Sequence, residues 1–143
     1  MPQRTAQAQW NGDLKSGSGH MKFGGGAFDC AYSFDSRFAD GKGTNPEELI
    51  AAAHAGCFTM ATAGGLTRAG FAPSRLSTTA TVHLESESGG FSIKRIDLVM
   101  DASVPGIDDA AFQKIVEDAK KGCPVSRALA GVPEIVAKAT LAK

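Results

Sequence analysis

The sequence predicts an α+β fold, because strand-like and helical segments along its 143 residues come in blocks rather than in regular alternation. Residues 1–45 contain short alternating segments broken by glycines, a pattern that favours strands and tight turns. An Ala-rich helical segment comes next, and a β-branched hairpin separates it from two further helical segments. Since no repeat and no long linker divides these blocks, residues 1–143 are expected to form a single domain.

The N-terminal block is predicted to contain three strands, at residues 6–10, 17–23 and 28–34. The glycines at 24–26 interrupt the chain between the second and third strands. We expect this run to be the tip of a hairpin rather than an anion-binding loop. Arg37 then lies between two aromatic residues at the end of the third strand. Its simplest role there is to cover apolar surface with its aliphatic stem.

The clearest local signal is the start of a helix. Thr44 or Asn45 can cap it, and Pro46 suits its first position, where a missing N–H is harmless. Glu47 and Glu48 then put negative charge in the first turn, where the helix dipole favours it. For one of these two acids, we expect the dipole to be the whole explanation.

This helix is expected to be long and buried. It continues through His54 and Cys57 and stops near Gly70 and Pro73. Residues 49–67 form the only long uncharged stretch, but their Ala, Gly and Thr content makes them a poor bilayer span. We therefore predict a buried core helix, and no membrane association.

The C-terminal block is predicted to begin with a hairpin and to end with a strand. β-branched alternation marks the hairpin strands, and the turn falls at residues 88–90. In chain order, these elements are strands over 77–84 and 91–102, an amphipathic helix over 108–122, a short helix after Pro124 and a strand over 134–141.

Charge and cysteine content exclude some classes of function. The fifteen basic and fifteen acidic residues cancel, so no overall field favours nucleic acid or an anionic membrane. Residues 1–7 are polar and lack the apolar region of a signal peptide, so a cytoplasmic location is expected. Three cysteines make a poor disulfide framework, and in a reducing compartment a disulfide between two of them would be transient and catalytic.

Two of the cysteines have settings of chemical interest. Cys57 lies within the apolar helix, where a free cysteine is most often an inert, small hydrophobic residue, so a reactive Cys57 needs a cation nearby. Cys123 precedes Pro124 at a predicted helix N-terminus and follows Lys120 and Lys121, which together favour a thiolate. Local physics therefore makes Cys123 the more acidic thiol. The alternative is that Cys123 merely fills a break between two helices.

Other candidate residues point less clearly to chemistry. His54 shares a helix face with Cys57 and could act as a base or as half of a metal site. No second ligand stands at suitable spacing, so no metal is expected, and His20 and His83 are best explained as exposed strand residues. Cys30 lies in a strand-like segment without an activating setting. Because no phosphate loop, dinucleotide fingerprint or nucleophile elbow is present, no cofactor is expected.

Taken together, these motifs resemble the OsmC/Ohr family of thiol-dependent peroxidases, and its OsmC branch in particular. The matching segments are residues 34–38, 43–49, 52–58, 104–107 and 122–126. The resemblance implies an intertwined α+β homodimer, in which antiparallel strands wrap around two long central helices and the active sites lie at the dimer interface.

The resemblance also implies a role for each site residue. Cys57 would attack organic hydroperoxides or hydrogen peroxide, Cys123 would resolve the resulting sulfenic acid as a disulfide, and an external dithiol would reduce that disulfide. Such a dithiol is a lipoyl protein or a small thiol. Arg37 would stabilise the Cys57 thiolate and Glu47 would hold the guanidinium. This assignment reverses the order of reactivity that local physics favours.

Helix geometry constrains how these residues can meet. Glu47 and Cys57 are ten residues apart on one predicted helix, which separates them by roughly 15 Å along its axis. Either Arg37 spans much of this gap, or Arg37 and Glu47 serve the Cys57 of the other subunit, which is our prediction. The alternatives to a peroxidase are a non-enzymatic redox sensor or hydrophobic-ligand binder with the same fold, and a metal-binding protein based on His54 and Cys57.

Overall fold

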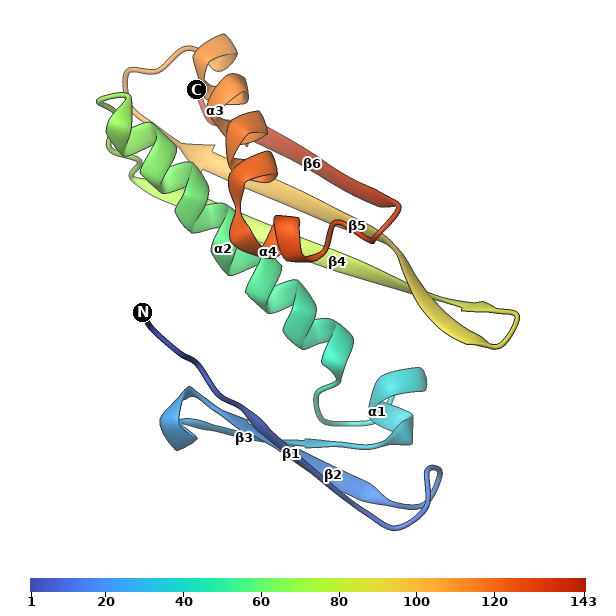
Figure 1. Ribbon diagram of the computed structural model, residues 1–143. Coiled ribbons are helices and arrows are strands. Elements are labelled where there is room, and N and C mark those ends of the chain that lie inside the picture. Colours follow the sequence, from blue (N-terminus) through green and yellow to red (C-terminus); the bar gives the residue numbers. More distant parts are fainter. The chain divides into compact units, whose positions relative to one another are not determined.

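The computed structural model describes all residues 1–143, which form two compact units, Met1–Leu49 and Ile50–Lys143. It confirms the α+β class, with two separate three-stranded sheets and four α-helices (Figure 1). In chain order the elements are β1 (Gln7–Asn11), β2 (Ser18–Phe23), the 3₁₀ turn η1 (Gly24–Gly26), β3 (Phe28–Tyr32), α1 (Phe34–Phe38), α2 (Pro46–Arg68), β4 (Arg75–Glu87), β5 (Gly90–Ser103), α3 (Asp109–Gly122), α4 (Pro124–Ala128) and β6 (Glu134–Leu141).

The first unit is an antiparallel β1–β2–β3 sheet followed by the short helix α1. Phe23 pairs with Phe28 across η1, so the glycine run is the hairpin tip that the sequence predicts. The third strand, however, ends at Tyr32, and Arg37 lies in α1 rather than at the end of a strand. The reason is local: Ser33 and Ser36 form a reciprocal capping box, with N–H···Oγ distances of 2.8 and 3.1 Å, which begins a helix there.

Helix α2 begins where the sequence predicts, and the structure identifies its cap as Asn45. The Asn45 Oδ1 accepts a hydrogen bond from the Glu48 N–H at 2.8 Å, and its Nδ2 donates to the Ser36 carbonyl at 3.0 Å. The same side chain therefore caps α2 and ties it to α1. At the other end, Gly70 adopts a positive φ of 91°, and the following N–H of Phe71 bonds back to the Leu66 carbonyl.

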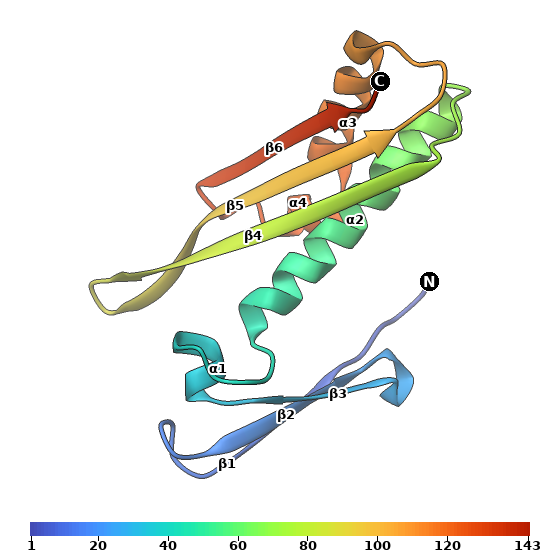
Figure 2. The same cartoon turned by 180° about the vertical axis from the view of Figure 1, so that it is seen from behind.

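The second unit is a β4–β5–β6 sheet with α2 and α3 packed on one face (Figure 2). β4 and β5 form the expected antiparallel hairpin, but β6 pairs with β5 in parallel, so the expectation of purely antiparallel strands is wrong here. The physical reason is the connection: α3 and α4 carry the chain back across the sheet between β5 and β6, and such a crossover joins parallel strands.

The core of the second unit lies between α2, α3 and the inner face of β5. Its fully buried side chains include Phe58 and Leu66 from α2, Phe112 from α3, and alternate residues of β5. The opposite face of α2 is open: Met60 is 78% exposed, and only 22% of the apolar window of this helix is buried. The prediction of a buried core helix therefore holds for one face of α2, and the other face is exposed in the single chain. By length and composition alone, α2 is also the one helix that could cross a membrane.

Candidate functional site

The structure brings Cys57 and Cys123 together, although 65 residues lie between them in the sequence. Cys57 projects from the middle of α2, and Cys123 occupies the junction between α3 and α4, where it is fully buried. Both are free thiols, and their side chains interact directly. Two free thiols that interact with each other can be joined by oxidation as a disulfide and separated again by thiol exchange.

The two sulfurs receive hydrogen bonds from the start of α4. Pro124 at the first helical position leaves the next N–H groups free to point back along the chain. The Ser126 N–H donates to Cys123 Sγ at 3.5 Å, so that the cysteine side chain caps its own helix. A hydrogen bond from the Val125 backbone N–H lowers the pKa of both Cys57 and Cys123. This short helix therefore supplies donors that stabilise negative charge on sulfur.

These donors favour ionisation of Cys123 over Cys57. Burial raises the pKa of the Cys57 thiol, and its hydrogen bond with Cys123 raises it further, against a smaller opposing effect of the Val125 N–H. Burial also opposes ionisation of Cys123, but its hydrogen bonds with Cys57, Ser126 and Val125 together hold the pKa of Cys123 below its usual value. The direction agrees with the local argument from the sequence. No cation is among the groups that shift the pKa of Cys57.

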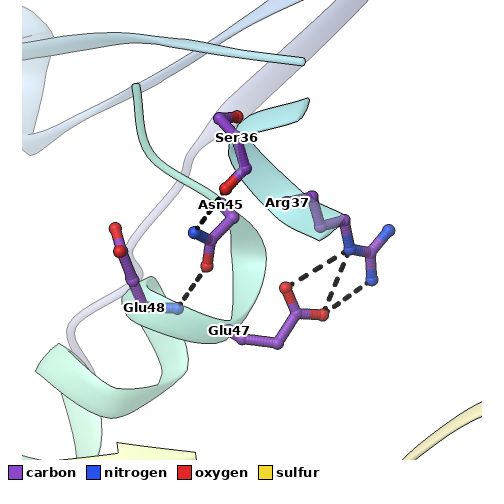
Figure 3. A network of polar contacts seen from close by, with 5 residues as sticks. All are labelled: Ser36, Arg37, Asn45, Glu47 and Glu48. Atoms are coloured by element: carbon purple, nitrogen blue, oxygen red, sulfur yellow. Dashed lines mark hydrogen bonds and ion pairs between the residues drawn. The ribbon is translucent and has the colours of Figure 1, made fainter. Parts of the chain in front are cut away.

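The other two predicted site residues, Arg37 and Glu47, form an ion pair within the first unit (Figure 3). The Arg37 Nη2 donates to Glu47 Oε1 at 2.8 Å, and its Nε donates to both carboxylate oxygens at 3.2 and 3.3 Å. The Glu47 side chain is only 11% exposed, whereas that of Arg37 is 39% exposed. Glu47 therefore holds one edge of the guanidinium, and the second Nη group is left for another acceptor.

The two acids at the start of α2 lie differently in Figure 3, which indicates different roles. Glu48 donates its backbone N–H to the Asn45 cap, while its carboxylate points away from Arg37. Glu48 is exposed, and its only side-chain contact is a weak hydrogen bond from Thr44 Oγ1 at 3.4 Å. Glu48 is thus the acid for which the helix dipole is a sufficient explanation, as the sequence predicts for one of the two.

His54 lies one turn before Cys57 on α2 and is fully buried. Its Nε2 forms a 2.7 Å hydrogen bond with Ser126 Oγ, while its Nδ1 is buried without a hydrogen-bond partner. Burial lowers the pKa of His54, so its ring is neutral near pH 7. The sequence motifs alone do not mark Ser126 as a site residue. The available signal was its spacing from Cys123, since a residue three positions after an N-cap donates its N–H to that cap.

The remaining candidates lie apart from the thiol pair. Cys30 is half-buried in β3 and is unpaired. His20 pairs with Asp29 at 2.9 Å on the first sheet, and His83 pairs with Asp97 at 2.7 Å on the second. No group of three or more His, Cys, Asp or Glu side chains is placed to hold a metal ion. None of these residues adds to the chemistry of the thiol pair.

Comparison with known proteins identifies similar chains. A family model described as OsmC-like protein matches residues 39–138. The chain is 47% identical to peroxiredoxin OsmC of Escherichia coli over 127 residues, which cover 88% of this chain and 89% of that protein. It is 36% identical to an organic hydroperoxide resistance protein of Xanthomonas axonopodis over 99 residues, 65% of this chain and 64% of that one. The fold matches the crystal structure of an OsmC-like protein from Mycoplasma pneumoniae with a TM-score of 0.77, at 20% identity and 99% coverage of both chains.

Proposed function

The chain belongs to the OsmC-like protein family, and on that premise we propose that it is a thiol-dependent peroxidase that reduces organic hydroperoxides and hydrogen peroxide. The observation that carries this proposal is that the free thiols of Cys57 and Cys123 interact, so that each shifts the pKa of the other. A redox sensor could use the same pair, but the relatives named as a peroxiredoxin and a hydroperoxide resistance protein favour turnover of peroxide.

The reaction we propose has three steps. The Cys57 thiolate attacks the distal oxygen of the peroxide, the O–O bond breaks, and the leaving alkoxide takes a proton to become an alcohol, or water from hydrogen peroxide. The Cys123 thiolate then attacks the Cys57 sulfenic acid, forming the disulfide, and hydroxide leaves as water after gaining a proton. An external dithiol, a lipoyl protein or a small thiol, finally reduces the disulfide by two exchange steps and is itself oxidised to a disulfide.

The first step requires a thiolate at Cys57, and the single chain does not favour one there. Burial raises the pKa of Cys57, whereas the donors at the start of α4 act mainly on Cys123. We propose that the missing cation is Arg37, whose second Nη group is not used by Glu47. A guanidinium donating a charge-assisted hydrogen bond to Cys57 Sγ would stabilise its thiolate and would also orient the peroxide.

Arg37 and Cys57 would meet in a homodimer. Since α2 is one continuous helix, Glu47 and Cys57 are separated by roughly 15 Å along its axis, which is too far for one subunit's ion pair to serve its own thiol. The open face of α2 supports a dimer, because it is apolar and lined by small residues against which a second helix can pack closely. Its exposed residues are Ala52, Ala53, Gly56 and Met60. We propose that a second copy of α2 covers this face, in the cytoplasm and without a membrane.

A thiol count tests the proposed activity. One equivalent of cumene hydroperoxide should lower the number of titratable thiols in the unfolded chain from three to one, since Cys57 and Cys123 are consumed together. A Cys30→Ser chain is the matched control and should fall from two thiols to none. No loss of thiols would rule out the peroxidase. Loss of a single thiol would show oxidation without resolution and would rule out the role of Cys123.

A mixing experiment tests the shared site. Arg37→Ala and Cys57→Ser chains are each expected to be inactive, but a refolded mixture contains heterodimers with one intact site. Those heterodimers should recover up to about half of the wild-type activity per heterodimer, because one of two sites is complete. Heterodimers that stay inactive would show that Arg37 serves the thiol of its own subunit. The matched control is a mixture of Arg37→Ala and Glu47→Ala chains. Neither chain of its heterodimers carries a complete Arg37–Glu47 pair, so both sites should stay impaired.

A further inference from the structure

His54 has no part in the proposed peroxide chemistry, yet it is the one buried ionisable side chain beside the thiol pair that the mechanism leaves unused. It is fully buried, and its Nδ1 has no hydrogen-bond partner. A buried, unpaired polar atom is destabilising relative to an apolar side chain of the same size. The geometry of its other ring nitrogen gives a reason for its presence.

The imidazole of His54 contacts the residue that donates to Cys123. His54 Nε2 lies 2.7 Å from Ser126 Oγ, and the Ser126 backbone N–H lies 3.5 Å from Cys123 Sγ. A hydrogen bond from the Ser126 side chain also lowers the pKa of Cys123. Ser126 is itself buried, with 8% of its surface exposed, so the three side chains form a continuous array shielded from water.

The unpaired Nδ1 indicates which way the protons point along this array. A neutral imidazole carries one N–H, and placing it on Nδ1 would bury a donor without an acceptor. Proteins tolerate an unpaired acceptor better than an unpaired donor, which favours the tautomer with its proton on Nε2. The Nε2–H then donates to Ser126 Oγ, and the Ser126 hydroxyl is free to donate to Cys123 Sγ.

We propose that His54 is a positioning residue for the resolving thiol: it orients the Ser126 hydroxyl so that Ser126 donates to the Cys123 sulfur from both its N–H and its O–H. This inference rests on the proposed peroxidase cycle, and it adds His54 and Ser126 to the steps in which Cys123 takes part. The array stabilises Cys123 as a thiolate, which is the attacking group when the disulfide forms. It stabilises the same thiolate as the leaving group when a reductant thiolate attacks Cys57.

The expected effect on rate follows from two opposing terms. Loss of one hydrogen bond to a thiolate lowers the thiolate fraction of Cys123 by about tenfold at a pH below its midpoint. The remaining thiolate is more nucleophilic, by about threefold for a Brønsted coefficient near 0.4–0.5. Resolution of the sulfenic acid should therefore slow by about threefold. Oxidation of Cys57 by peroxide, which does not involve Ser126, should be unchanged.

Three variants at position 54 separate positioning from packing. His54→Gln places an amide N–H close to the position of Nε2 and should preserve the hydrogen bond to Ser126. His54→Asn reaches only as far as Nδ1, and His54→Leu fills the space without a donor, so both should lose that bond. Ser126→Ala removes the hydroxyl but keeps the backbone N–H. Combined with His54→Leu, it should cause no further loss, because both changes break the same array.

The first measurement needs no peroxide. In chains that also carry Cys30→Ser and Cys57→Ser, Cys123 is the only thiol, and its ionisation is followed by ultraviolet thiolate absorbance against pH. The midpoint should move upward in His54→Leu, His54→Asn and Ser126→Ala, and should stay near the parent value in His54→Gln. Equal midpoints in all five chains would overturn the proposal. A shift in His54→Gln as large as in His54→Leu would show a packing effect and would overturn it as well.

The second measurement follows resolution in chains that keep Cys57. With excess hydroperoxide, slower resolution leaves the sulfenic acid open to a second oxidation, so mass spectrometry should find about threefold more Cys57 sulfinic acid in His54→Leu and Ser126→Ala than in His54→Gln. Should His54→Leu fail to fold, His54→Asn takes its place in both measurements. If the wild-type chain loses no thiols to peroxide, the proposed function fails, but the titration of Cys123 still decides the role of His54. Unchanged sulfinic acid in Ser126→Ala would overturn the positioning role.

Discussion

Replacement of Arg37 by lysine tests whether the guanidinium, rather than a positive charge alone, activates Cys57. Arg37 uses Nε and one Nη group to hold Glu47, at 2.8 to 3.3 Å, and keeps the second Nη group for another acceptor. A lysine has a single ammonium and cannot reproduce this planar fork. Arg37→Lys should therefore keep most of the ion pair with Glu47 and lose the bond that we assign to the thiolate.

The two consequences should differ greatly in size. The Arg37 side chain is 39% exposed, so its pairing with Glu47 is partly screened, and the substitution should change the free energy of unfolding by at most about 1 kcal/mol. A charge-assisted hydrogen bond to a thiolate contributes about 1.5–3 kcal/mol, which corresponds to a fall of roughly 10- to 150-fold in the rate of Cys57 oxidation.

Stopped-flow oxidation by cumene hydroperoxide and urea unfolding measure these two quantities separately. Arg95→Lys is the matched control, because the Arg95 side chain has a similar exposure of 41% and also forms ion pairs, in its case with Asp97 and Glu134. It should reproduce the small stability change and leave the oxidation rate unaltered. Activation of Cys57 by the guanidinium is refuted if the rate of Cys57 oxidation in Arg37→Lys is within about twofold of the wild-type rate, or if Arg37→Lys and Arg95→Lys slow the oxidation equally.

Three further predictions concern the Glu47 carboxylate, the open face of α2 and the buried His54. Glu47→Gln should slow oxidation of Cys57 in stopped-flow measurements, because a guanidinium without its Glu47 partner is less well positioned. Glu48→Gln is the control and should leave this rate unchanged, because the Glu48 carboxylate is exposed and has only a weak contact with Thr44. Gly56→Glu, on the open face of α2, should convert the proposed homodimer to monomer in analytical ultracentrifugation and abolish peroxidase activity. An active Gly56→Glu dimer would disprove the proposed interface. Burial lowers the pKa of His54, so from about pH 6.5 downward the unfolded chain binds more protons than the folded one. The free energy of unfolding should therefore fall as pH falls through this window, by at most about 1.4 kcal/mol per pH unit, and urea titrations of His54→Gln should show a shallower dependence than those of wild type.

Several elements of this fold could be predicted because their causes are local. The start of α2 depends on an Asn45 cap followed by Pro46 and two acids, and all of these are neighbours in the chain. The hairpin of β4 and β5 follows from β-branched alternation around a glycine turn. Predictions failed where a nearby hydrogen bond outweighed the pattern: the Ser33 and Ser36 capping box places Arg37 in a helix, although the aromatic residues around it suggest a strand.

The candidate site divides in the same way. The residue types and motifs around Cys57, Cys123, Arg37 and Glu47 are present in the sequence, and they were sufficient to identify the family. The single-domain prediction stays a prediction, as does the role of each of these residues. The ion pair of Arg37 with Glu47 rather than Glu48 was predicted through the family resemblance alone, because both acids occupy the first turn and local propensity does not choose between them.

By itself, the sequence determined the order of the strands and of every helix except α1, the start of α2 and the family, because each of these depends on residues close together in the chain. Only the tertiary structure decided that β6 runs parallel to β5, that one face of α2 is open, and that Ser126 joins His54 to Cys123. The physical reason is the range of the interactions. Caps, turns and periodic patterns act over a few residues, whereas the bond between His54 and Ser126 joins residues 72 positions apart, and the pairing of β5 with β6 joins strands that two helices separate in the chain.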